Sequence, residues 1–258
     1  MHAWLSGLIG VVAYFGAAYA FARERRMVAL CLAGAAFLVH GTFLYPHTLT
    51  QQGVSIGLVN AASIVAWCIG GVVLLLNVRR PLASLAVVLL PLAALALVLD
   101  ISLPATRVLT EQPPFGMQVH IALAIIAYSL FAIAAIQALL LAFATRQLRH
   151  HHPVLNFLPP LPTMEAVMFQ LTALAFALLT ASLVVGSAYI ENVRSQHLAH
   201  KIVFSALAWL VFATLVFGRW RWDWRGRRGI KFVITGFALL ALAFFGTKFV
   251  LELVLHRV

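Results

Sequence analysis

Charge is scarce in this 258-residue sequence, and acidic charge is the scarcest kind. Only 10% of the residues are charged, and seven Asp and Glu stand against 18 Lys and Arg. A soluble domain carries about 25% charged residues, which cover its surface. Because 63% of this chain is hydrophobic, its polar side chains are too few to face water on all sides. The composition predicts a polytopic membrane protein whose solvent is lipid.

Cysteine is nearly absent as well. Cys31 and Cys68 fall in different apolar runs at different depths, which excludes a disulfide framework and favours small buried side chains. The sequence contains no P-loop, no glycine-rich dinucleotide turn and no Ser-His-Asp order. The formal charge of +11 does not indicate nucleic-acid binding, because the basic residues form short clusters between apolar runs. No catalytic constellation is found, and an enzymatic function is not expected.

The apolar runs are long enough for helices that cross a bilayer, which need about 20 residues each. They predict an all-α bundle in a single integral membrane domain, residues 1–258. The eight expected spans are near 3–22, 27–45, 55–77, 81–99, 117–145, 163–190, 198–217 and 229–254.

Basic clusters occupy alternate connectors and indicate the orientation. They read RERR (23–26), RR (79–80), RQLRHHH (146–152) and RWRWDWRGRRGIK (219–231). The positive-inside rule places these connectors in the cytoplasm and both termini outside, which is the periplasm in a bacterium. The first apolar run has its basic cluster behind it, so no cleavable signal peptide is expected.

Histidines gather near the outer ends of the spans. His40, His120 and His200 belong to three different spans at similar depth. A polar group inside a span is costly and by default faces the bundle interior with a partner. Each imidazole could simply hydrogen-bond to a neighbouring helix or to interfacial water. Three of them at one depth favour a shared cavity beneath the outer surface.

Neutral imidazoles at such a cavity suggest two ligands. Haem iron takes one or two axial histidines, while apolar side chains pack the macrocycle and a cation such as Lys201 can meet a propionate. A divalent metal is the alternative, because three histidines suit a catalytic-type zinc site. The pair His197-x-x-His200, in QHLAHKIVF, has no carboxylate within four residues to act as a base.

Two further motifs have structural interpretations. RWRWDWRGRR is typical of an interfacial anchor, with indoles at headgroup level and arginines toward phosphates. Glu165, in PTMEAVMF, is expected to act in the first turn of its own helix, where a carboxylate is favoured by the dipole.

Several segments resemble one known family. HIALAIIAYSLFAIAAIQALLL (120–141) resembles the HVxLxxxSYxxF helix of CcsA-like cytochrome c assembly proteins, and GFALLALAFFGTKFVLELVLH resembles their last helix. HGTFLYPHTLTQQGVSIGLVNAASIVAW resembles their early segment with a membrane histidine. The resemblance covers most of the chain from about residue 30 and is greatest to the YpjD/HemX-type branch of inner-membrane proteins. It implies that His120 is the first outer haem ligand, His40 the membrane histidine and His256, shifted by one residue, the second outer ligand.

The sequence also departs from the family pattern. The tryptophan-rich motif WGxxWxWDPKExW should precede the seventh span, where this chain reads ENVRSQHLAHKIVF. WRWDW follows that span instead, on the expected inner face. We therefore interpret His197 and His200 as replacement polar groups at the outer cavity, and covalent attachment of haem to apocytochrome is not expected.

Together these observations predict a non-enzymatic haem-binding protein of the bacterial inner membrane. The cofactor is a non-covalent, b-type haem, and His40, His120 and His200 are the candidate axial ligands of its iron. The expected partners are the lipid bilayer and haem-synthesis or haem-trafficking proteins, with no nucleic acid. Divalent metal export and a scaffold that regulates haem synthesis remain alternatives. The full set of expected cofactor-binding residues is His40, His120, His197, His200, His256 and Lys201.

Overall fold

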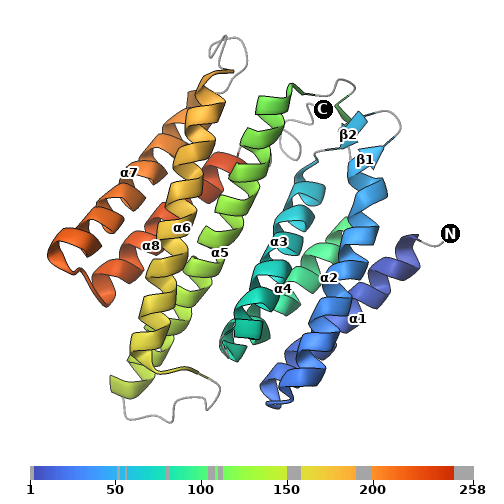
Figure 1. Ribbon diagram of the computed structural model, residues 1–258, viewed down its shortest axis with the longest axis horizontal. Coiled ribbons are helices and arrows are strands. Elements are labelled where there is room, and N and C mark those ends of the chain that lie inside the picture. Colours follow the sequence, from blue (N-terminus) through green and yellow to red (C-terminus); the bar gives the residue numbers. More distant parts are fainter. Residues whose placement is uncertain are drawn as a thin grey trace. The chain divides into compact units, whose positions relative to one another are not determined.

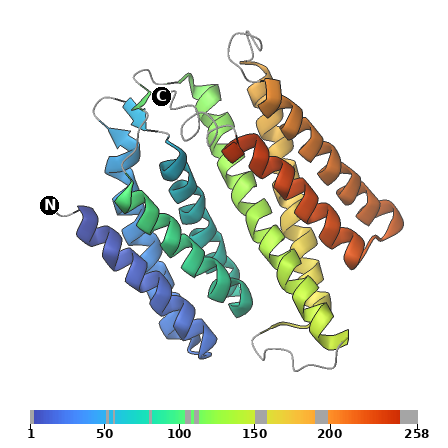
Figure 2. The same ribbon diagram turned by 180° about the vertical axis from the view of Figure 1, so that it is seen from behind.

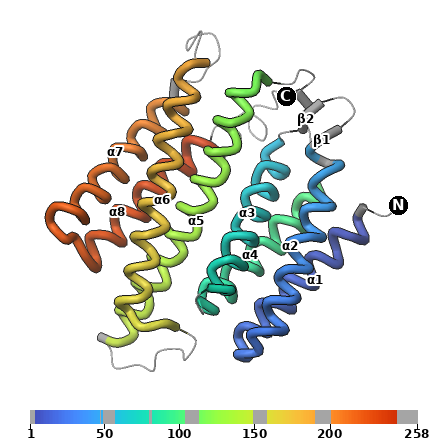
Figure 3. Tube along the Cα trace, in the orientation of Figure 1, coloured from blue at the N-terminus to red at the C-terminus, as the bar shows by residue number. Residues whose placement is uncertain are grey.

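The computed structural model shows a chain built almost entirely of helices (Figure 1). The structure describes residues 3–50, 53–55, 57–79, 82–103, 108–109, 113–149, 158–189 and 199–246. The chain divides into two compact units. Unit 1 contains α1 to α4 and a small sheet, and unit 2 contains α5 to α8 and a π-helix. Figure 3 traces the path of the chain through each of them.

Unit 1 is an antiparallel bundle of four helices. Its helices are α1 (Ala3–Ala22), α2 (Arg26–Thr48), α3 (Leu58–Arg79) and α4 (Ala83–Ser102). Helix α1 packs against α2 and α4, and α3 packs against the same two helices, so the four enclose one core. Figure 2 shows α4 from the side on which it crosses this bundle. Arg26 ties two helices together, because its guanidinium donates to the carbonyl oxygens of Asn77 and Val78 at the end of α3.

Three short strands form a sheet beyond the end of α2, which the sequence patterns did not predict. They are β1 (Leu49–Thr50), β2 (Gly53–Ser55) and β3 (Val108–Leu109), in the order β1-β2-β3. Both pairings are antiparallel, with Val54 opposite Leu49 on one side and Leu109 on the other. The pairing satisfies backbone groups of the two connectors that leave the bundle at this end.

Unit 2 is also a ring of four helices. Its elements are α5 (Phe115–Arg149), α6 (Leu161–Ser187), α7 (Ala199–Trp222), α8 (Arg227–Ala241) and a π-helix (Leu242–Gly246). Helix α5 packs along α6 and α8, and α7 packs along the same two helices. An aromatic layer crosses the core, where the rings of Phe131 and Phe212 stack at 3.8 Å and the ring of Tyr128 lies 5.4 Å from that of Phe237.

Seven helices in the described residues, α1 to α7, are long and apolar enough to cross a membrane. Large apolar side chains on their outer faces are exposed, among them Val12, Leu38 and Leu210. Small residues fill the contacts between helices, and Ala17, Ala36 and Ala134 are completely buried. This inside-out distribution suits a lipid solvent, in which close packing of small residues holds helices together. The predicted all-α membrane bundle is confirmed; the orientation of its termini stays a prediction.

Most helix boundaries differ from the expected ones by a few residues, and two elements differ most. Helix α7 continues to Trp222 and α8 begins at Arg227, so most of the expected tryptophan-rich connector, 219–231, is helical. Asp223 lies one turn beyond Arg219 and forms ion pairs of 2.7 Å with Arg219 and with Arg225. These ion pairs stabilise the end of the helix. The last expected span, 229–254, is described only as far as Gly246, as α8 followed by the π-helix.

Candidate functional site

His120 lies in the second turn of α5 and packs against α6. Its Nδ1 atom is 2.7 Å from the carbonyl oxygen of Ser182, and the Ser182 hydroxyl donates to the His120 carbonyl oxygen at 3.1 Å. A carbonyl oxygen only accepts, so Nδ1 carries the hydrogen and donates it. In the neutral ring Nε2 is then left with a lone pair. This is the tautomer that binds a metal through Nε2.

A glycine makes room for this ring. Gly186 lies one turn beyond Ser182 on α6, and a Cβ atom added to it would stand 2.5 Å from Nδ1 and 2.6 Å from Cε1 of His120. The imidazole therefore rests on bare backbone. At the same end of the bundle Gly116 lies against the hydroxyl of Tyr189. The close approach of α5 and α6 holds the His120 ring in one orientation.

Helix α7 is joined to α6 on another face of the same unit. The Trp209 indole donates to the hydroxyl of Thr180 at 2.9 Å, and its ring lies 5.6 Å from that of Phe176. Lys201, in the first turn of α7, is half-buried. Trp209 therefore holds α7 against α6. Lys201 belongs to the first turn of the same helix.

His40 occupies a different setting, the core of unit 1. Its side chain is completely buried between α1, α2 and α3. The Tyr14 hydroxyl lies 3.1 Å from Nδ1, and the Ser63 hydroxyl lies 3.1 Å from Nε2. The Tyr14 ring meets the imidazole edge-on, with centroids 5.7 Å apart. Both ring nitrogens are thus engaged in a Tyr–His–Ser chain that links three helices, and ligation by His40 would require one of these bonds to be given up.

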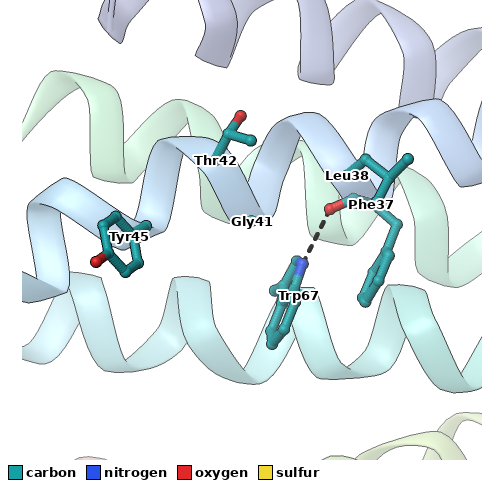
Figure 4. A pocket seen from close by; sticks show the side chains of 6 residues that line it. All are labelled: Phe37, Leu38, Gly41, Thr42, Tyr45 and Trp67. Carbon is teal, nitrogen blue, oxygen red and sulfur yellow. Dashed lines mark hydrogen bonds between the residues drawn. The ribbon is translucent and has the colours of Figure 1, made fainter.

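An apolar pocket of about 450 Å³ lies between α2 and α3 of unit 1 (Figure 4). The Trp67 indole reaches across from α3, stacks on Phe37 at 4.8 Å and donates to the Phe37 carbonyl oxygen at 2.9 Å. The Thr42 hydroxyl donates to Val39 of its own helix. Since these polar groups are already used, the pocket offers mainly apolar contacts.

Comparison with known proteins places the chain in a family. The family described as Cytochrome C assembly protein matches residues 29–255. The chain belongs to the cytochrome c assembly protein family. It is 32% identical over 232 residues to the inner membrane protein YpjD of Escherichia coli K12, a match that covers 89% of this chain and 88% of the relative.

A second relative in the comparison is an uncharacterized 28.8 kDa protein of Azospirillum brasilense. It is 31% identical over 156 residues, which is 59% of this chain and 58% of the relative. No solved structure matches. The predicted family is confirmed, and so is the coarser functional statement that this is a multi-pass membrane protein of the cytochrome c assembly family.

The remaining expected site residues of this family member are only partly placed. His197 and His256 lie outside the described residues, and for His200 the structure describes only its place in α7. His40 and His120 belong to separate units, each described by itself. The hypothesis that imidazoles from several spans share one pocket therefore stays a prediction. Within the described part of the chain, no three His, Cys, Asp or Glu side chains are grouped so as to hold a metal ion.

Sequence reasoning missed the residues that hold the two histidines. Ser182 and Gly186 are four residues apart on one helix face, the small-xxx-small spacing that marks close helix contacts in membranes. That spacing was a usable signal for the His120 contact. Tyr14 and Ser63 carried no comparable signal, because single polar residues in apolar runs do not reveal their partners. Glu165 was misassigned: its Oε1 accepts the Gly226 N–H at 2.7 Å, at the start of α8 rather than in its own helix.

Proposed function

We propose that this protein is a haem-binding protein of the bacterial inner membrane, with Nε2 of His120 as an axial ligand of the iron. The observation that carries the proposal is the hydrogen bond from Nδ1 of His120 to the Ser182 carbonyl oxygen. A ligating histidine typically donates its other ring N–H to a backbone carbonyl or carboxylate. The bond orients the ring and keeps the hydrogen on Nδ1 before any ligand arrives.

Family membership supports the same assignment. The segment that begins at His120 resembles the family helix that starts with an outer haem-liganding histidine, and YpjD is named as an inner membrane protein. Haem would supply an iron that accepts one or two imidazoles and a macrocycle that packs among apolar side chains. The residues of this chain supply the imidazole and its fixed tautomer.

The proposed role is binding or transfer of haem without covalent attachment. The tryptophan-rich motif of the family is missing before α7, where it would present haem to an apocytochrome. Lys201, half-buried at the start of α7, would meet a propionate, and His40, His197, His200 and His256 stay candidate second ligands. Among these, His40 would have to give up a hydrogen bond to bind iron, because the Tyr14 and Ser63 hydroxyls already bond to both nitrogens of its ring.

The visible spectrum of the purified protein tests the proposal. Protein from haem-replete cells is expected to show a Soret band, which is lost in His120→Ala and regained by that variant in the presence of free imidazole. His151→Ala, in the basic run before α6, removes an imidazole elsewhere and serves as the matched control. A colourless protein that does not take up added haem would refute the proposal, as would an unchanged spectrum in His120→Ala.

Elemental analysis of the same sample separates haem from divalent metal transport, which predicts stoichiometric metal without porphyrin. No observation in the described residues favours that alternative or the scaffold alternative over haem binding.

A further inference from the structure

A cavity of about 630 Å³ lies at the end of unit 2 where α5 ends and α6 and α8 begin. Three cationic side chains line it: Arg146 from α5, and Arg227 and Lys231 from α8. All three are exposed at its mouth. The cavity is distinct from the His120 site, which is near the opposite ends of α5 and α6. We call it the cation cavity.

The deeper wall of the cation cavity is apolar. Leu141 and Ala142 contribute from α5, Leu161 from α6 and Ile230 from α8. The two apolar lining residues from α5 lie inside a segment long and apolar enough to span a membrane, and Leu161 begins another. The cavity is therefore cationic at its mouth and apolar behind it. This division matches an amphiphile better than a small inorganic ion.

The cavity cations lack acidic partners in the described part of the chain. The ion pairs there join Asp223 to Arg219 and Arg225, and no carboxylate lies within 4 Å of the three cavity cations. Among the described residues that line the cavity, Glu165 is the only acid, and its Oε1 accepts the Gly226 N–H at 2.7 Å. That contact leaves the Glu165 carboxylate engaged with the residue that precedes α8.

The neighbouring turn places the cavity at the depth of lipid headgroups. Trp220 is 81% exposed and Trp222 is 58% exposed, at the end of α7. Arg228 lies over the Trp224 ring at 5.9 Å. Exposed tryptophans and arginines of this kind gather at the membrane–water interface. The positive-inside rule predicts that this interface is the cytoplasmic one, whose lipids include anionic species.

We propose that the cation cavity binds the phosphate of an anionic phospholipid, with Arg146, Arg227 and Lys231 around the headgroup and an acyl chain along Leu141 and Ile230. The three cations attract the phosphate at the mouth of the cavity, and arginine can hold it through two parallel N–H···O bonds. The apolar wall distinguishes this ligand from free phosphate. The proposal does not depend on haem binding.

Native mass spectrometry of the full-length protein in detergent tests it. The probes are phosphatidylglycerol and phosphatidylcholine with identical acyl chains. The wild type is expected to bind the first at least about tenfold more tightly, since each nearby cation contributes roughly fivefold to binding of anionic lipid. In the triple variant Arg146→Gln/Arg227→Gln/Lys231→Gln, affinity for phosphatidylglycerol is expected to fall by one to two orders of magnitude, toward that for phosphatidylcholine.

Two further variants keep the test sharp. Arg25→Gln/Arg79→Gln/Arg221→Gln makes the same change of charge at exposed sites that do not line the cavity, and its affinity should fall less than about threefold by loss of general attraction. Ala142→Phe fills the apolar wall without changing charge and should weaken both lipids. Circular dichroism confirms that each variant is folded before its affinity is compared.

Three results would overturn the proposal. One is equal binding of the two lipids by the wild type. Another is equal loss of affinity in the cavity triple variant and in the exposed control. The third combines two observations: millimolar inorganic phosphate displaces phosphatidylglycerol, and Ala142→Phe binds both lipids as tightly as the wild type. Together they would assign the cavity to free phosphate.

Discussion

The Nδ1 atom of His120 on α5 donates a hydrogen bond to the carbonyl oxygen of Ser182 on α6, across 2.7 Å. The acceptor belongs to the backbone, so the orientation of the ring depends on how closely the two helices approach, and the Ser182 hydroxyl adds a second bond between them. Gly186 permits that approach, because any Cβ there would collide with the ring. The position of one imidazole is thus decided by a glycine one turn beyond its hydrogen-bond acceptor.

Gly186→Ala is expected to displace the His120 ring and to reduce haem occupancy several-fold. It should also lower the free energy of unfolding by about 1–3 kcal/mol, the usual cost of adding a methyl group to a tight contact. Ser182→Ala keeps the carbonyl acceptor and should retain the Soret band. Gly34→Ala is the control, since its added Cβ would meet only Leu74, at 4.0 Å. Equal spectra for Gly186→Ala and Gly34→Ala would contradict the expectation.

Tyr14→Phe and Ser63→Ala each remove one hydrogen-bond partner of His40. Each leaves one buried nitrogen of the imidazole without a hydrogen bond. Each should lower stability by about 0.5–1.5 kcal/mol, the range for a single hydrogen bond between membrane helices. Thermal unfolding in detergent measures the effect. Thr42→Val, which removes an exposed hydroxyl bonded within its own helix, should change stability by less than about 0.5 kcal/mol. If both core variants were as stable as the wild type, the Tyr–His–Ser chain would not contribute to the stability of unit 1.

Glu165→Ala should destabilise the junction of α6 with the α7–α8 turn by about 1–3 kcal/mol, because it removes the charged acceptor of the Gly226 N–H. Glu165→Gln retains an oxygen acceptor and should cost less than half as much. Hydrogen exchange at the Gly226 amide reports on the same contact and should accelerate more in the alanine variant. Identical exchange in all three proteins would show that this hydrogen bond does not form in solution.

Gln137→Leu is expected to leave stability unchanged or to raise it by up to about 1 kcal/mol. The Gln137 amide donates to the Met164 carbonyl oxygen at 3.1 Å, but its own buried Oε1 has no hydrogen-bond partner in the described part of the structure. A buried acceptor without a partner costs as much as one hydrogen bond supplies. A loss of more than about 2 kcal/mol on thermal unfolding would indicate that Oε1 has a partner in the membrane.

Much of the fold followed from patterns that are local in sequence. Apolar runs of about 20 residues require helices in lipid, because only a helix satisfies every backbone group within one segment. The start of α1, for example, was predicted to the residue. The short strands at Leu49, Gly53 and Val108 escaped prediction because two or three residues carry no periodic signal. The helical end of α7 was also missed, because its ion pair with Asp223 stabilises residues whose composition resembles a connector.

Composition and apolar patterning were enough to predict the solvent, the helices and the family, and the cost of placing an imidazole in lipid singled out His40 and His120. The partners of each imidazole became known from helix packing. In unit 1, Tyr14 and Ser63 use both nitrogens of His40, whereas in unit 2 the Ser182 carbonyl uses one nitrogen of His120. The physical reason is that the partners lie on other helices, 23 to 62 residues away. Their distances depend on helix packing, which no local pattern specifies.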